Sequence, residues 1–142
     1  MGRGEASKLN MKQSPVVHFE MPAKDKKRVS KFYTEAFGWQ MHQLGADMEN
    51  YVLAGTTPTD ERQMTQNPGE INGGFFDWKD EEGFRTPHIV IQVENLDESI
   101  NAIKNAGGEI KSEKMDIPGI GTYVSFIDTE GNNVGMLQPP KA

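Results

Sequence analysis

The amino-acid sequence predicts an α+β domain that consists of two tandem βαβββ modules. Two stretches are alike: each is a short apolar strand with one histidine, followed by an amphipathic helix and a glycine. At a constant offset of seventy positions His18 aligns with His88 and Gly38 with Gly108, so strand, helix and helix end keep their register. Such internal similarity indicates a duplication. Two equivalent modules in pseudo-twofold contact would place the two histidines at equivalent positions.

Length and composition fit one globular domain, or two half-domains that share a core. The chain has 142 residues, of which 35% are hydrophobic and 25% are charged. No run approaches the ~20 apolar residues of a membrane span and no leader is apparent, so we expect a soluble, cytoplasmic protein without a membrane partner. The absence of cysteine is compatible with a reducing compartment. The net charge of -6 opposes binding to phosphate backbones, so we expect no nucleic acid partner.

The division of the chain follows from composition. Residues 1–14 lack apolar periodicity and are predicted to be a disordered extension. Residues 15–142 are predicted to form the domain, with modules over residues 15–79 and 86–138. The acidic, glycine-containing stretch between the modules is the best boundary.

The first module begins with a strand that carries the first candidate site residues. Val16 to Met21 alternates like a half-buried strand, which places His18 and Glu20 on one face. Asp25 is positioned to cap a helix, and Gly38 ends that helix because glycine tolerates a left-handed backbone. The apolar positions between them have helical spacing: Val29, Phe32, Tyr33 and Ala36.

Three further strands complete the first module, over residues 39–44, 50–54 and 71–78. The Thr-, Pro- and Asn-rich segment from Gly55 to Gly69 is long for a connection, and it is either a binding loop or lid, or an idle surface excursion. In the last strand, Gly73 and Gly74 remove side chains where a ligand or another backbone approaches closely.

The second module repeats this scheme. His88, Val90 and Gln92 share one strand face, and the opposite face is apolar enough to cover a helix. Asn95 or Asp97 caps that helix. Strands are predicted over residues 109–114, 123–127 and 133–138, with hairpin and tight turns between them. Alternation in the strand over 123–127 suggests that Tyr123 faces inward.

Several motifs resemble the vicinal oxygen chelate superfamily, which includes glyoxalase I, the bleomycin-resistance proteins, methylmalonyl-CoA epimerase and extradiol dioxygenases. They are Val-Val-His18-Phe-Glu-Met-Pro, Lys31-Phe-Tyr-Thr-Glu-Ala-Phe-Gly38-Trp, Ile71-Asn-Gly-Gly74, Ala106-Gly-Gly, Ile117-Pro-Gly-Ile-Gly121-Thr-Tyr and Asp128-Thr-Glu-Gly-Asn132-Asn-Val-Gly-Met. The resemblance implies that the modules form a half-open eight-stranded barrel around a cavity, with the helices outside and the chemistry inside.

The resemblance also implies where a metal ion would sit. Metal-dependent relatives take ligands from the first, fourth, fifth and eighth strands, commonly two His and two Glu. Here His18 and His88 match the histidine positions, whereas the carboxylate positions match Gly135 and either Gly73 or Gly74. Two imidazoles alone make a weak divalent metal site, for Zn, Ni, Fe or Mn. Glu20 would supply a third ligand and recreate a two-histidine, one-carboxylate set.

Two classes of function follow. In the first, the chain is a binding protein that holds a small organic molecule in a cavity enlarged by glycines, lined by Gly73, Gly74, Val90, Gln92, Tyr123 and Gly135. In the second, it is a lyase, isomerase or dioxygenase-like enzyme in which His18, Glu20 and His88 handle protons, with or without metal. Without the acidic ligands, a functional glyoxalase I is not expected. The resemblance also implies a homodimer.

Overall fold

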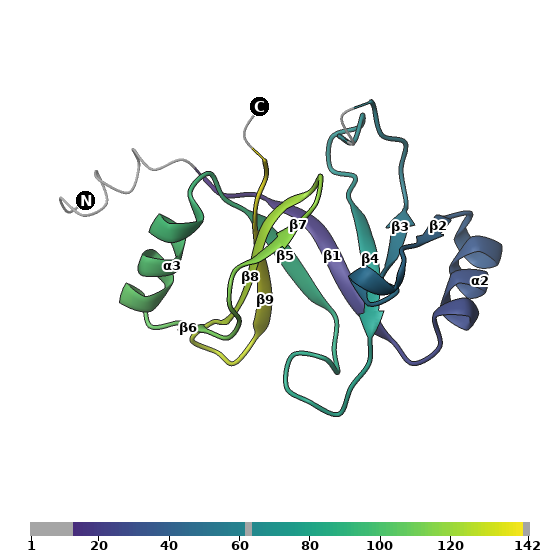
Figure 1. Ribbon diagram of the computed structural model, residues 1–142. Helices are drawn as coiled ribbons and strands as arrows, with labels where there is room; N and C mark the ends of the chain where they lie inside the picture. Colours follow the sequence, from purple (N-terminus) through teal and green to yellow (C-terminus); the bar gives the residue numbers. More distant parts are fainter. Residues whose placement is uncertain (1–12, 62–63, 141–142) are drawn as a thin grey trace.

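The computed structural model describes residues 13–61 and 64–140. These residues form a mixed α+β fold with two α-helices and one curved sheet that does not close (Figure 1). The disordered extension predicted for residues 1–14 lies outside the described residues except for its last two. Within the described part of the chain, no helix is long and apolar enough to cross a membrane.

Both modules have the predicted order of strand, helix and further strands. The first contains β1 (Val16–Ala23), α2 (Lys26–Phe37), β2 (Gln40–Gln43), the short 3-10 helix η1 (Ala46–Met48), β3 (Val52–Gly55) and β4 (Asn72–Asp77). The second contains β5 (His88–Gln92), α3 (Leu96–Asn105), β6 (Glu109–Ile110), β7 (Met115–Ile117), β8 (Gly121–Ile127) and β9 (Asn133–Gln138).

One predicted strand was wrong. Of the strand expected over residues 109–114, only Glu109 and Ile110 form a strand, β6, and a separate strand, β7, begins at Met115; each pairs with β8. The interruption falls at Ser112, whose hydroxyl oxygen accepts the backbone N–H of Ser125 at 2.9 Å. A side chain thus takes the place of a backbone partner, and the regular ladder stops there.

Short-range signals fix the helix ends. The Asp25 carboxylate accepts the backbone N–H of Arg28 at 2.9 Å, and Gly38 ends α2 with a left-handed φ of 71°. Of the two candidates for the second cap, Asn95 caps α3 and accepts the backbone N–H of Glu98 at 3.0 Å. Such caps contribute about 1 kcal/mol each to helix stability.

The two modules join at the centre of the sheet. The strand order is β2-β3-β4-β1-β5-β9-β8-β6, with β7 added to β8. Within the modules β1 runs parallel to β4 and β5 parallel to β9, whereas β1 and β5 pair antiparallel and connect the modules. Figure 1 shows α2 and α3 at opposite ends of this sheet, with β1 and β5 between them.

Each helix covers its own core on the same face of the sheet, which we call the outer face. One cluster of buried side chains lies towards α2 and consists of Ala23, Val52, Ala54 and Phe75. The other lies towards α3 and consists of Val93, Leu96, Val124, Phe126, Val134 and Met136. Because side chains alternate along a strand, the residues between these positions point to the opposite, inner face. The candidate site residues lie there.

The long connection after β3 has an ordered base. The Asn72 side-chain oxygen accepts the backbone N–H groups of Thr56 at 2.7 Å and Thr57 at 3.0 Å. The Thr57 hydroxyl donates to the Glu70 carboxylate at 2.8 Å. These bonds tie both ends of the loop to the start of β4, and its role as a lid or binding loop remains a prediction.

Candidate functional site

Polar side chains converge on the inner face where β1 meets β5. Glu20 and His88 are directly opposite each other in the antiparallel pairing of these strands. His18 lies two residues before Glu20, so it is on the same face. Tyr51, just before β3, and Tyr123, in β8, approach from the two modules. One carboxylate is therefore surrounded by two imidazoles and two phenols.

Glu20 is the centre of this cluster, and three groups bond to its carboxylate. One oxygen, Oε1, is 2.9 Å from His88 Nε2 and accepts the Tyr123 hydroxyl at 2.9 Å. The other, Oε2, accepts the Tyr51 hydroxyl at 2.9 Å. Side-chain exposure is only 13% for Glu20 and 10% for His88, so water screens these bonds little. We call the set of Glu20, Tyr51, Tyr123 and His88 the Glu20 cluster.

The balance of burial and hydrogen bonding keeps Glu20 ionised. Burial by itself raises the pKa of a carboxyl group. The hydrogen bond and charge of His88, with the hydroxyls of Tyr123 and Tyr51, outweigh burial and lower the pKa of Glu20 below its ordinary value. The same arrangement raises the pKa of both tyrosines, through burial and the neighbouring Glu20 charge. The phenols therefore stay protonated and act as donors to a carboxylate.

His18 belongs to this region but does not touch Glu20. Its Nε2 lies 3.4 Å from the Tyr51 hydroxyl, a long contact, and no hydrogen bond between His18 and Glu20 is present among the described residues. Burial lowers the pKa of His18, and the His88 charge adds to this effect, although the Glu20 charge opposes it. His18 is therefore held neutral.

The inner-face glycines leave room for the two tyrosine rings. A Cβ added at Gly74 would overlap the Tyr51 ring and hydroxyl, and one added at Gly135 would overlap those of Tyr123. A Cβ at Gly73 would instead overlap Phe19, which packs into the core beside α2. Gly74 and Gly135 thus share the inner face with the Glu20 cluster, and Gly73 lies on the outer face.

Both modules contribute an equivalent tyrosine to the Glu20 cluster, but only the first module contributes a carboxylate. Gly74 pairs with Glu20 across β1 and β4, and Gly135 pairs with Val90 across β5 and β9. Val90 is therefore the counterpart of Glu20, and its side chain is buried. Because the second module has an apolar residue at this position, both tyrosines bond to the single carboxylate of the first module.

Comparisons with known proteins agree with this fold. The profile of the Glyoxalase/Bleomycin resistance protein/Dioxygenase superfamily matches residues 16–136. The chain belongs to this superfamily. A glyoxylase-like domain-containing protein of Didymella fabae is 31% identical over 124 residues, which cover 85% of this chain and 91% of that protein. A probable lactoylglutathione lyase of Vibrio parahaemolyticus is 28% identical over 137 residues, which cover 93% and 96% of the two chains.

Solved structures of the superfamily fold are also similar. Methylmalonyl-CoA epimerase from Mycobacterium tuberculosis superposes with a TM-score of 0.61 at 14% identity, covering 95% of this chain and 96% of that one. A superfamily member from Vibrio splendidus 12B01 superposes with a TM-score of 0.57 at 13% identity, covering 89% and 99%. At these identities the similarity shows the fold alone.

The residues present do not fit the divalent metal ion that many superfamily members use. Within residues 13–61 and 64–140, no three His, Cys, Asp or Glu side chains are grouped so that they could hold a metal ion. The set of His18, His88 and Glu20 fails because His18 contacts Tyr51 and because both Glu20 oxygens are already hydrogen-bonded. Tyrosine rings lie over the two glycines that replace the acidic ligands.

Three other residues, of which Gln92 was predicted to line the cavity, complete the description of this region. Gln92 follows Val90 on the inner face and is partly exposed; its backbone N–H donates to Pro15. His42, the third histidine of the chain, is exposed in β2. Phe76 stacks on His88, with ring centroids 5.3 Å apart, and so contributes an aromatic surface to the inner face.

Sequence reasoning missed Tyr51. The strand pairings show that the two tyrosines occupy equivalent positions in the two modules. Leu53 pairs with Gly74, and Tyr51 lies two residues before Leu53. Ser125 pairs with Gly135, and Tyr123 lies two residues before Ser125. Tyr51 and Tyr123 are therefore equivalent, although they are not separated by the seventy positions that relate the histidines. Aligning the modules by strand pairing would have identified both.

Proposed function

We propose that this superfamily member binds a small organic molecule on the inner face of its sheet, beside the Glu20 cluster, without a resident metal ion. The observation that carries the proposal is the convergence of three side chains from both modules on the single buried carboxylate of Glu20. Buried polar networks of this kind position ligand-binding groups precisely. Phe76 and His88 add a planar surface at its edge.

Proton transfer is the second candidate function, and the neutral His18 favours it. A neutral imidazole near a tyrosine hydroxyl can accept a proton from a bound substrate. An ionised Glu20 would then stabilise positive charge that develops on the neighbouring side chains. The chain would act as a metal-independent isomerase or lyase. Names of relatives, such as probable lactoylglutathione lyase, agree with this class.

Turnover of the methylglyoxal–glutathione hemithioacetal is not expected. That chemistry, as the resemblance to glyoxalase I implies, depends on a carboxylate that binds metal and moves a proton. Here glycine occupies those positions, and Glu20 is occupied by three hydrogen bonds.

The binding proposal predicts a localised response to small ligands. Neutral oxygen-bearing molecules such as phenol, catechol and acetophenone should shift backbone amide resonances of inner-face residues in β1, β4, β5 and β8. Titrations followed by 15N–1H correlation spectra measure this. Control titrations use acetate, which carries a negative charge that Glu20 repels. Shifts confined to α2, α3 or the outer face would contradict the proposal.

We further propose that the chain forms a homodimer. Val16 and Ile89 are 44% and 43% exposed on β1 and β5, between the two helix-covered cores. A twofold contact buries the same patch on both chains. Light scattering at micromolar concentration should give twice the mass of one chain. The Ile89→Lys variant should give a lower mass, because the charged side chain opposes burial of the patch. A monomeric wild type, or a dimer unaffected by Ile89→Lys, would count against this interface.

A further inference from the structure

The first residue of the helix differs between the two modules. Lys26 begins α2, and Leu96, seventy positions later, begins α3 and is buried. The Lys26 side chain is also buried, with only 9% exposed. Positive charge is unfavourable at the N-terminal end of a helix, and burial of an ammonium group adds a further cost. A lysine at this position is therefore expected to have a specific role.

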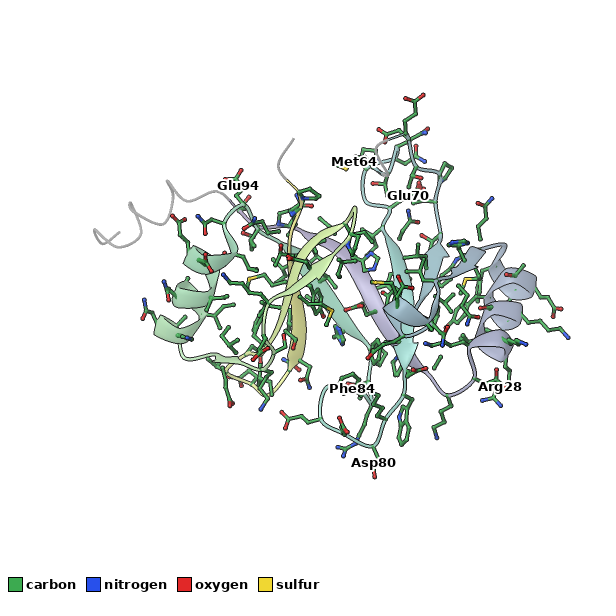
Figure 2. All side chains as sticks on the ribbon, viewed as in Figure 1. Arg28, Met64, Glu70, Asp80, Phe84 and Glu94 are labelled. Carbon is green, nitrogen blue, oxygen red and sulfur yellow. The ribbon has the colours of Figure 1, made fainter. Side chains whose placement is uncertain are left out.

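The Lys26 ammonium group connects the start of α2 to two other parts of the first module. It donates to the backbone carbonyl of Glu49 at 2.8 Å and forms an ion pair with Asp77, at the end of β4, with Nζ and Oδ1 2.9 Å apart. The neighbouring cations are placed differently. Lys27 and Arg28 are exposed, and Figure 2 shows Arg28 at the outer edge of the molecule. Lys26 thus points towards the sheet and joins α2 to it.

The carbonyl that Lys26 binds belongs to a strained turn over residues 45–51. Glu49 and Asn50 have left-handed backbone conformations, with φ of 55° and 56°. This region is unfavourable for residues that carry a Cβ atom, and it persists only where surrounding contacts hold it. Backbone hydrogen bonds close the turn on itself, whereas Lys26 ties it to α2 and β4. The bond from Lys26 lies two residues before Tyr51.

Tyr51 depends on this turn for its position. It lies just before β3, and its backbone N–H donates back into the turn, to Met48 at 3.0 Å. Its hydroxyl nevertheless donates to Glu20 Oε2 at 2.9 Å. The equivalent Tyr123 lies inside β8, where it pairs with Leu137. Regular strand pairing therefore holds Tyr123, whereas Tyr51 is held by the turn.

We propose that Lys26 is a positioning residue that places the Tyr51 hydroxyl on Glu20 by holding the turn of residues 45–51. It acts through the backbone of Glu49 and touches neither the Glu20 carboxylate nor a ligand beside it. The apolar Leu96 suffices in the second module, because Tyr123 needs no such support. Only the consequence for ligand binding rests on the proposed function: a Glu20 carboxylate without its Tyr51 donor is less well fixed for a ligand on the inner face.

Lys26→Met tests this role, because methionine nearly keeps the length of the side chain and removes the charge and the donors. Lys27→Met, at an exposed position in the same helical turn, is the matched control. The readout is the exchange of tyrosine hydroxyl hydrogens with solvent. It is followed by NMR on full-length protein with 13Cζ-labelled tyrosine in mixed H₂O and D₂O. The chain has three tyrosines, Tyr33, Tyr51 and Tyr123.

The wild-type hydroxyls of Tyr51 and Tyr123 should exchange slowly, because both donate to the buried carboxylate. Lys26→Met should speed the exchange at Tyr51 about tenfold, the effect of weakening one hydrogen bond to a charged group. Tyr123 should remain slow, and Lys27→Met should leave both unchanged. The Tyr51→Phe variant assigns the Tyr51 signal.

A lysine that only stabilised the fold would give another pattern. Equal acceleration at Tyr51 and Tyr123, or an unchanged Tyr51, would overturn the inference. If Lys26→Met does not fold, Lys26→Met/Asp77→Asn replaces it, because removing both members of an ion pair costs less than removing one. The same comparison of the two tyrosines then decides.

Ligand binding separates this inference from the proposed function. Phenol should bind Lys26→Met about fivefold more weakly than the wild type, the effect of one hydrogen bond, and Lys27→Met should bind it like the wild type. Equal phenol affinity of Lys26→Met and the wild type would contradict the consequence for binding. If phenol does not bind the wild type at all, the proposed function fails, whereas hydroxyl exchange at Tyr51 still decides the role of Lys26.

Discussion

Replacing Glu20 with glutamine should lower the free energy of unfolding by about 2–4 kcal/mol, the loss expected when a buried charged acceptor is removed from its donors. The amide keeps one acceptor oxygen, and its NH₂ group faces hydroxyl and imidazole hydrogens. At least one of Tyr51, Tyr123 and His88 then loses its partner. Urea unfolding monitored by circular dichroism measures the change.

The acid dependence of stability provides a second readout for this variant. The pKa of Glu20 is lowered in the folded protein, so its contribution is fully present above the ordinary carboxyl value of 4.5 and is lost as pH falls through the lower folded pKa. The difference between wild type and Glu20→Gln should therefore shrink towards low pH. Glu113→Gln, at an exposed position, is the matched control. An unchanged free energy of unfolding in Glu20→Gln would show that the carboxylate does not hold the cluster together.

Gly135→Ala should destabilise the protein by about 2–3 kcal/mol, although a smaller unfolded-state entropy by itself favours alanine over glycine. The new methyl group would overlap the hydroxyl and ring of Tyr123. The ring must move, and its hydrogen bond to Glu20 is then lost. Gly55→Ala is the control, because its Cβ would meet no atom closer than 3.3 Å.

A double-mutant cycle isolates the cause. In a Tyr123→Leu background, the overlap is absent and Gly135→Ala should cost less than 1 kcal/mol, roughly the limit for a tolerated change. Chemical denaturation of all four proteins gives the coupling free energy. Equal costs in both backgrounds would mean that the glycine is required for another reason than the tyrosine ring.

The elements with local signals could be predicted from the sequence. Strand alternation placed His18 and Glu20 on one face, and the caps Asp25 and Gly38 bounded α2. These features depend on neighbouring residues, so periodicity and capping rules suffice. The superfamily resemblance then indicated the correct curved, unclosed sheet.

The partners within the site could not be predicted in the same way. The bond between Glu20 and His88 depends on the register between β1 and β5, which are far apart in sequence. Which of Gly73 and Gly74 lies on the inner face depends on the pleat of β4, and a shift of the strand register by one residue would exchange the two. Tyr51 lay within a predicted strand, but its equivalence to Tyr123 follows only from the pairing of β3 with β4 and of β8 with β9.

The metal content of the purified protein tests the central claim most directly. If the Glu20 cluster takes the place of the metal site, elemental analysis of protein purified without chelator should find far less than one Ni, Zn, Fe or Mn per chain. The donor geometry supports this expectation, since His18 contacts Tyr51 and the Glu20 oxygens are already bonded to their three partners. One tightly held ion of any of these metals per chain would contradict it.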